Sequence, residues 1–290
     1  MRLRATGLIA ILSFAIGFMG VSTARAQEGG GGGRGGAGAA NPTPPGPPHD
    51  PHDLNGIWLG PVGGGGGAGA NSPKTASAWA PRVALPLTPD GQKQMDTNKP
   101  SSGPRQVKPA FGNDPLGGAN PPGLLRTLMY GNFGASWKII QLEDEVMQVF
   151  EFGGFWRQIW TDGRKVPADP DVNWFGYSVG KWDSDVLDVQ TAGLDNREWL
   201  DIWGTPFSDS LRVEERWHRA DRDNLELTAT FTDPTFYTKP WTSDKKTYRF
   251  QPKGSKDGEI YQFIFSPMDE QSFNNNVRDP VAGVNHTPSK

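Results

Sequence analysis

The segment Trp160–Thr191, WTDGRKVPADPDVNWFGYSVGKWDSDVLDVQT, decides the fold class of this chain. It contains a rigid corner at Asp169-Pro170 and an aromatic, strand-like run over 174–182. A tight reversal at Asp183-Ser184 then leads into a second strand over 185–191. The segment therefore predicts a β-hairpin that follows a long, turn-rich loop.

The hairpin contains a motif that resembles a catalytic one. Gly176-Tyr177-Ser178-Val179-Gly180 matches the G-x-S-x-G of serine hydrolases. A nucleophile elbow needs a helix after the serine, with an acid and a histidine downstream. The residues after Ser178 instead keep a strand-type alternation, and only His218 and His286 follow it. We therefore reject Ser178 as a nucleophile and expect it to line space inside the sheet.

The strand over 174–182 has one face of small and aromatic residues, because side chains alternate between the two faces of a strand. The residues on that face are Trp174, Gly176, Ser178, Gly180 and Trp182. A two-residue loop at Asp183-Ser184 pairs Ser178 with Val189. Glycine inside a strand often marks close approach of a ligand or of another backbone. The notched face could pack against the long arm or line a ligand cavity, and the sequence leaves both open.

Strand-type segments continue through most of the chain and are separated by short turn sequences. The candidate strands are 54–60, 136–142, 145–152, 155–161, 174–182, 185–191, 210–219, 224–232, 244–252 and 258–266. Short connections indicate antiparallel neighbours. A closed barrel removes the exposed edges that so many strands would create. The predicted fold is therefore all-β, an antiparallel up-and-down meander closed into a barrel, with a β-sandwich as the alternative.

Composition divides the chain into five parts. They are a signal peptide over 1–26, a disordered Gly/Pro-rich tether over 27–52, a first strand plus long irregular arm over 53–134, the β-barrel domain over 135–270 and a flexible tail over 271–290. The tether lacks the apolar residues that a core needs. In the arm, Thr88-Pro89 predicts a short helix over 88–95, capped by Thr88. We expect Trp79, Phe111 and Leu124-Leu125 to pin the arm to the domain.

The N-terminus is typical of an exported protein. Arg2 and Arg4 form a positive start, an apolar run covers 8–21, and Ala24-Arg25-Ala26 is an A-x-A cleavage motif. Cleavage after Ala26 predicts a periplasmic or secreted protein. The apolar run is too short to span a bilayer, and no later segment could do so. We therefore expect no integral membrane segment after cleavage.

The charge balance limits the partners. The chain has 29 Lys and Arg against 32 Asp and Glu. The signal peptide holds three of the arginines and no acid, so the mature chain keeps 26 basic residues (29 − 3) against 32 acidic ones. This net negative charge disfavours binding to nucleic acid. There are no cysteines, so the fold depends on a core, for which 11 Trp and 15 Phe are available.

The strand over 210–219 carries one acid on its apolar face. That face consists of Leu211, Val213, Glu215 and Trp217. The next strand has its own apolar face, and the two faces coincide only if the connecting loop has an odd number of residues, with a bulge near 221–223. A buried carboxylate must be paired or have a raised pKa. Possible partners of Glu215 are Arg157, Arg164 and Arg249, and its role as structural ion pair, ligand contact or acid/base group stays open.

Two patterns suggest metal sites, and both fail. His49 and His52 alone, in a Pro-rich segment, supply too few ligands. A calcium-loop spacing begins at Asp169, but Trp174 stands where the loop needs glycine and Gly180 where it needs a bidentate glutamate. We therefore expect no metal and no cofactor.

Several motifs together resemble a large group of exported bacterial proteins of unknown function. The motifs are DLNGIW, TDGR, PADP, WFGYSVGKWDSDVLDV, WLD, SDSLRVEER and YTKPW. The resemblance covers about 155–242 well and 53–60 and 86–100 loosely. It implies a lipocalin-like barrel and export, and it implies no activity. Members often carry a cysteine before a Pro-Gly segment of the arm, whereas 118–123 has none here.

Three functions fit these observations. The first is an exported, lipocalin-like protein that binds a small apolar or aromatic molecule, with Arg164, Trp174, Ser178, Trp182, Glu215 and Trp217 as ligand-binding candidates. The second is an acid/base enzyme, a hydrolase, lyase or isomerase, that uses Glu215 in a barrel cavity. The third is a structural or assembly component of the cell envelope. A dry, closed cavity favours binding, an open cleft with a second titratable group favours catalysis, and a filled barrel with an exposed apolar patch favours assembly.

Overall fold

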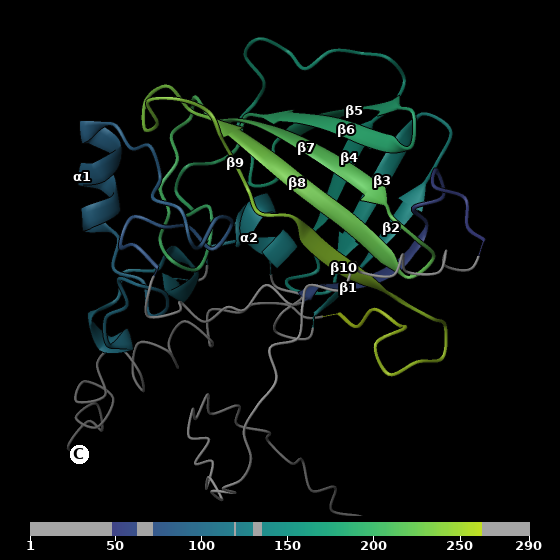
Figure 1. The fold of residues 1–290 in the computed structure, drawn as a ribbon, viewed down its shortest axis with the longest axis horizontal. Helices are drawn as coiled ribbons and strands as arrows, with labels where there is room; N and C mark the ends of the chain where they lie inside the picture. Colours follow the sequence, from purple (N-terminus) through teal and green to yellow (C-terminus); the bar gives the residue numbers. More distant parts are fainter. Residues whose placement is uncertain (1–47, 63–71, 119, 130–134, 263–290) are drawn as a thin grey trace, which may run out of the picture. The chain divides into compact units, whose positions relative to one another are not determined.

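The computed structural model of the chain describes residues 48–62, 72–118, 120–129 and 135–262 (Figure 1). The predicted signal peptide, the tether up to residue 47 and the tail over 271–290 lie outside the described residues. The strands are β1 (Gly56–Val62), β2 (Ser136–Gln141), β3 (Glu145–Phe150), β4 (Trp156–Trp160), β5 (Tyr177–Asp183), β6 (Val186–Ala192), β7 (Arg212–Arg219), β8 (Asn224–Thr232), β9 (Trp241–Thr242) and β10 (Lys246–Gln251). The helices are α1 (Pro89–Thr97) and α2 (Gly123–Met129), with single turns η1 (Pro109–Phe111) and η2 (Pro115–Gly118). Neither α1 nor α2 is long and apolar enough to cross a membrane.

The strands form a closed β-barrel. They are hydrogen-bonded in the order β10-β1-β2-β3-β4-β5-β6-β7-β8-β9, and β10 also pairs with β8. The β10–β8 pairing closes the sheet, and β9 adds a short extra strand to β8 (Figure 1). The predicted all-β barrel is therefore confirmed, and its architecture is lipocalin-like.

One strand pair departs from the predicted antiparallel meander. β4 and β5 run parallel and share two residue pairs, Ile159 with Ser178 and Trp160 with Val179. The connection over 161–176 is long enough to return the chain to the end of the barrel from which β4 started, which a parallel pair requires. All other neighbours in the sheet are antiparallel. The barrel is therefore mixed.

The β5–β6 hairpin has a different register from the predicted one. Its turn lies at Ser184-Asp185, where Ser184 adopts a positive φ of 52°, and Asp183 pairs with Val186. Ser178 consequently pairs with Thr191, and the predicted pairing with Val189 is wrong. A shift of two residues leaves every side chain on its original face. The face of Ser178 is therefore as predicted, while its partner is not.

The β7–β8 hairpin has the predicted odd spacing. Glu215 pairs with Ala229, and Arg219 pairs with Leu225, with five residues between the last two. No register shift interrupts the pairing of 212–219 with 225–232, so the expected bulge is not part of it. The two apolar faces therefore coincide and place Glu215 inside the barrel.

Other strand predictions were less accurate. Residues 258–262 of the candidate strand over 258–266 form no strand, and the rest of it lies outside the described residues. The two-residue strand β9 was not predicted. The closing strand is β10, in which Phe250 pairs with Trp58 of β1 and Tyr248 with Leu225 of β8.

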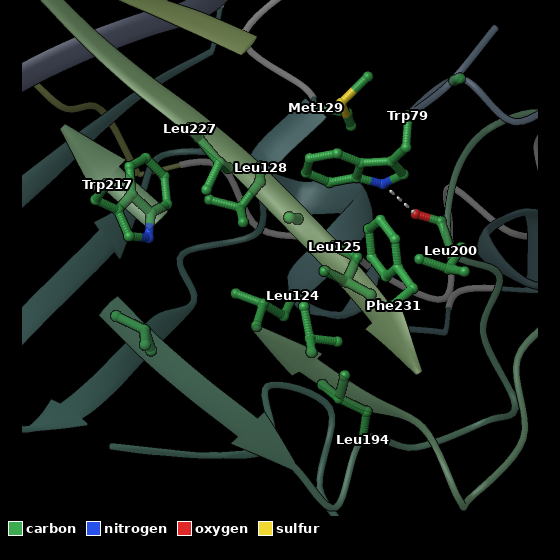
Figure 2. Packing of buried hydrophobic residues seen from close by; sticks show 14 of the residues in the cluster. Trp79, Leu124, Leu125, Leu128, Met129, Leu194, Leu200, Trp217, Leu227 and Phe231 are labelled. Atoms are coloured by element: carbon green, nitrogen blue, oxygen red, sulfur yellow. Dashed lines mark hydrogen bonds between the residues drawn. The ribbon is translucent and has the colours of Figure 1, made fainter. Parts of the chain in front are cut away.

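The arm contains the predicted helix and a second one. Thr88 caps α1 by accepting a hydrogen bond from the Gly91 backbone N–H at 3.0 Å, with Pro89 in the first turn, as expected. Every residue of α2 is buried, and the helix was not predicted. Its leucines pack among Trp217, Leu227 and Phe231 of the barrel strands (Figure 2).

The arm is held to the domain by buried contacts. Trp79 is fully buried, and its Nε1–H donates to Leu200 O at 3.1 Å (Figure 2). Asp201 is also buried and accepts hydrogen bonds from Ser77 Oγ and from the Ala78 N–H at 2.6 Å. The expected anchoring by Trp79 and by Leu124-Leu125 is confirmed. Phe111 is 68% exposed, so its expected role is wrong.

Candidate functional site

The inside of the barrel contains one buried ion pair. Arg157 enters from β4 and Glu215 from β7, and both side chains are fully buried. Arg157 Nη2 lies 2.7 Å from Glu215 Oε1, and Nη1 lies 2.9 Å from Oε2. The pair is therefore bidentate, the strongest geometry for an arginine and a carboxylate. Of the three arginines considered as partners of Glu215, the structure selects Arg157.

The remaining N–H groups of Arg157 are also bound. Nε donates to Ser178 Oγ at 2.9 Å, Nη2 to Thr191 Oγ1 at 2.6 Å and Nη1 to Gln148 Oε1 at 3.2 Å. A guanidinium has five N–H donors, so these three bonds and the two to Glu215 use all of them. The strands thus supply a hydrogen-bond acceptor for each N–H group of Arg157.

Glu215 has further donors around it. Trp217 Nε1 donates to Glu215 Oε2 at 2.9 Å, and Thr191 Oγ1 lies 3.4 Å from Oε1. Burial, and secondarily the nearby Glu215 carboxylate, raise the pKa of the Tyr248 phenol well above its usual range. Both oxygens of the Glu215 carboxylate accept hydrogen bonds from these donors, so neither is open to a substrate. The site can stabilise the barrel, but it lacks the open carboxyl that acid/base catalysis requires.

The space around the ion pair is filled by large side chains. The inward aromatic residues are Trp58, Trp137, Phe150, Trp217 and Tyr248, all buried. The Trp137 ring lies 5.6 Å from that of Trp217 and 5.2 Å from that of Tyr248, centroid to centroid. α2 adds Leu128, whose backbone carbonyl accepts a 3.1 Å hydrogen bond from Tyr248 Oη. This interior is a packed core.

The notch at the glycines of β5 is occupied by neighbouring side chains. A Cβ on Gly180 would lie 2.9 Å from Ile159 Cγ2 and 3.2 Å from Leu187 Cδ1. Gly176 has a φ of +67°, and a Cβ there would lie 2.8 Å from Ala192 O. These contacts come from β4, β6 and the residues that follow them, so the notch is filled by the barrel itself, and the expected packing against the arm is wrong.

The structure brings together three of the six ligand-binding candidates. Ser178, Glu215 and Trp217 meet inside the barrel. Arg164 pairs with Asp162, and its guanidinium carbon lies 3.7 Å from the centroid of the Trp160 ring, on the outer surface. The other two candidates are also separate from the ion pair.

Trp174 and Trp182 have different neighbours. The guanidinium carbon of Arg197 lies 4.6 Å from the centroid of the Trp174 ring. The Trp182 ring lies 4.6 Å from that of His52, whose Nε2–H donates to Ser184 O at 2.8 Å. His49 contacts Arg219 O instead, at 3.1 Å, so the two histidines bind different parts of the chain.

A pocket lies outside the core, at the rim of the barrel. Its volume is about 520 Å³. It is lined by Asp169, Pro170, Val172, Gly193, Asp209, Ser210, Arg212, Thr232 and Pro234. These residues belong to the loop before β5, the residue after β6, the segment that leads into β7 and the end of β8 with the turn after it. The sequence contained a signal for this site, because the PADP and SDSLRVEER motifs both supply lining residues, but alternation alone could not show that they meet.

Arg212 is the only cationic residue that lines the described pocket. Its Nη2 and Nη1 donate to Ala168 O and Leu211 O, both at 3.3 Å, which is long for a charge-assisted bond. Among the described residues no carboxylate forms an ion pair with it. The guanidinium therefore has no carboxylate partner within ion-pair distance, although Asp169 and Asp209 also line the pocket.

The wall beside Arg212 is fixed by Asp233-Pro234. Asp233 is buried and accepts from the Ser208 N–H and Ser208 Oγ, both at 2.7 Å, and from the Thr235 N–H at 3.1 Å. These contacts tie the segment before β7 to the turn that follows β8, which together form one wall of the pocket.

Comparison with protein-family models, with curated proteins and with solved structures finds no match. In the part of the chain that the structure describes, no three His, Cys, Asp or Glu side chains gather as a metal ion would require. The site must therefore be interpreted from its own geometry.

Proposed function

We propose that this protein is a binding protein for a small molecule, held in the rim pocket instead of inside the barrel. The observation that carries the proposal is the unpaired guanidinium of Arg212 in a pocket of about 520 Å³. This volume falls within the range of about 300–1,000 Å³ typical of small-molecule sites.

The lining supports a ligand with two chemically different parts. Pro170, Val172 and Pro234 offer apolar surface, which suits an aliphatic or aromatic portion. Arg212 suits a carboxylate, because its planar donors match the two oxygens of that group. The ligand class proposed is therefore a small apolar or aromatic acid. A purely apolar ligand would leave the charge of Arg212 unused.

The packed interior argues against the two functions that need an internal cavity. An apolar ligand inside the barrel would have to displace aromatic side chains and the leucines of α2. Catalysis by Glu215 would require breaking its bidentate contact with Arg157. Binding in the rim pocket requires neither the displacement of core side chains nor the loss of the Arg157–Glu215 contact.

Mass spectrometry of molecules that co-purify with the protein from its native host tests the proposal. Three forms are compared: the wild type, Arg212→Gln at the rim and Ser178→Ala inside the barrel. Ser178→Ala removes the hydrogen bond that Arg157 Nε donates and should cost about 1.5–3 kcal/mol of stability, so it serves as the control variant for the interior. The wild type and Ser178→Ala are expected to carry the same acidic molecule, and Arg212→Gln to lose it.

Three outcomes would contradict this proposal. A wild type that is always empty would count against small-molecule binding. Retention of the molecule by Arg212→Gln would remove the rim pocket as its site. Loss of the molecule from Ser178→Ala alone would place it inside the barrel.

A structural or assembly role is the second candidate, and one observation favours it. The outer face of β2–β4 carries apolar residues among polar ones: Ile140 pairs with Met147, and Val149 pairs with Trp156 on one side and Lys138 on the other. The Trp156 side chain is 59% exposed.

Sedimentation velocity over a concentration series would detect self-association through this face. A Trp156→Glu variant should then be monomeric, and a wild type that is already monomeric throughout would oppose the idea.

A further inference from the structure

A second cluster of charges surrounds Arg126 of α2. Arg126 of α2 is 1% exposed and contacts two carboxylates. Its Nη1 and Nη2 each lie 2.8 Å from an oxygen of Asp114, and Nη1 lies 3.1 Å from Glu198 Oε2. Three segments meet here: the arm before η2, α2, and the loop between β6 and β7.

Glu198 is the least compensated member of this cluster. Its residue is 2% exposed, and its Oε1 is buried without a hydrogen-bond partner among the described residues. The bidentate contact of Arg126 goes to Asp114, so Arg126 gives Glu198 a single, longer hydrogen bond. A buried, unbonded carboxylate oxygen is costly when ionised and much less so when protonated.

The other charges nearby do not compensate Glu198. Asp195 and Arg197 lie on the same loop and pair with one another at 2.5 Å, and Arg197 stacks on Trp174. α2 contributes only Arg126, and the arm contributes Asp114, whose charge opposes ionisation of Glu198. The Gly123 backbone packs against the Glu198 side chain, where a Cβ would lie 3.7 Å from Glu198 Cβ.

These surroundings raise the pKa of Glu198 to about 7. Burial is the largest cause, and the repulsion from Asp114 adds to it. Arg126 and the Trp199 backbone N–H act in the opposite direction but do not outweigh burial. A carboxyl whose pKa is raised in the folded state binds its proton more tightly there than when exposed. The stability it confers is present at acidic pH and is lost as the pH rises toward 7.

We propose that Glu198, Arg126 and Asp114 form a proton-linked latch that joins α2 and the arm to the β6–β7 loop. Protonation of Glu198 closes the latch, because a neutral carboxyl tolerates burial beside Asp114. Ionisation loosens it, because the buried Oε1 has no donor to bind. The docking of α2, which fills one part of the barrel, is thereby coupled to pH in the range from acidic to neutral.

Hydrogen–deuterium exchange of peptides that cover 123–129 tests the latch at pH 4 and pH 8. The wild type is compared at each pH with Glu198→Gln, which imitates the protonated acid. The intrinsic exchange rate is the same for both proteins at one pH, so the ratio of their rates reports the latch. At pH 4 the rates should agree. At pH 8 the wild type should exchange faster by on the order of a hundredfold.

Two further variants separate the latch from a simple packing role. Glu214→Gln changes an exposed acid on β7 and should behave as wild type at both pH values. Asp114→Asn removes the competing carboxylate, so Arg126 can pair fully with Glu198 and the pH-dependent loosening should shrink.

Each contrary result overturns the proposal. Equal pH dependence in wild type and Glu198→Gln would mean that Glu198 does not titrate in this range. A constant loss of protection in Glu198→Gln at both pH values would show a structural role alone. If Glu198→Gln does not fold, an unchanged pH profile in Asp114→Asn would by itself exclude the latch.

Discussion

Glu215 and Arg157 share two hydrogen bonds inside the barrel, and a change at either one leaves the other charge buried. We predict that Glu215→Gln destabilises the protein by about 3–5 kcal/mol, because the neutral amide cannot balance the Arg157 guanidinium. Chemical denaturation measures the change in the free energy of unfolding. Glu214→Gln, one residue away but exposed, should change it by less than about 0.5 kcal/mol.

The opposite result would indicate that Glu215 has a functional role. A Glu215→Gln variant that keeps its stability but loses a bound ligand or an activity would show that the carboxylate serves the site instead of the fold. The structure opposes that outcome because each of the five N–H groups of Arg157 already has an acceptor within the barrel.

At single residues, the sequence predicts the face of a side chain better than its partner. Alternation placed Glu215 and Ser178 inside the barrel, and both are there. It could not choose Arg157 over Arg164 or Arg249, because that choice depends on which strands become neighbours. Arg212 was correctly placed on the outer face of its strand, but only the folded structure brings the PADP loop against it.

At the scale of elements, α2 contributes to the stability of the core over its whole length, because all seven of its residues are buried. Leu128 is fully buried among the barrel strands. We predict that Leu128→Ala lowers the free energy of unfolding by about 2–5 kcal/mol, through lost transfer energy and the cavity left behind. Leu142→Ala, at a leucine that is 53% exposed, is the matched control and should cost little. Similar small losses in both would mean that α2 is not part of the core.

The elements that were predicted have a clear periodic signal, and those that were missed do not. α1 carries a cap and a first-turn proline, which are local signals. α2 is short and buried on every side, with Arg126 and Thr127 buried beside its leucines, so it has no amphipathic period to detect. The parallel pairing of β4 with β5 was missed because a turn-rich connection does not reveal at which end of the barrel it finishes. The predicted register of the β5–β6 hairpin was wrong by two residues. The turn lies at Ser184-Asp185, where Ser184 adopts the positive φ, and no glycine marks that position in the sequence.

In the whole molecule, the residues that stabilise the fold differ from those that line the proposed binding site. The interior aromatic residues and the Arg157 pair hold the sheet together, and the rim pocket is built from loops attached to it. This is a common division of roles, since loops on a rigid scaffold tolerate the variation that binding needs. A change in the pocket, such as Arg212→Gln, should therefore alter ligand content while leaving the unfolding transition nearly unchanged.

The prediction that the whole chain is exported rests on its N-terminal sequence. We predict that the mature protein begins at Gln27, because Ala24 and Ala26 provide the small side chains that signal cleavage needs. Cell fractionation followed by intact-mass analysis of the periplasmic and medium fractions measures the mature terminus. Replacement of both alanines by leucine should leave the protein uncleaved and attached to the membrane. A wild type recovered from the cytoplasm at its full mass of 31.5 kDa would exclude export and, with it, a ligand encountered outside the cytoplasm.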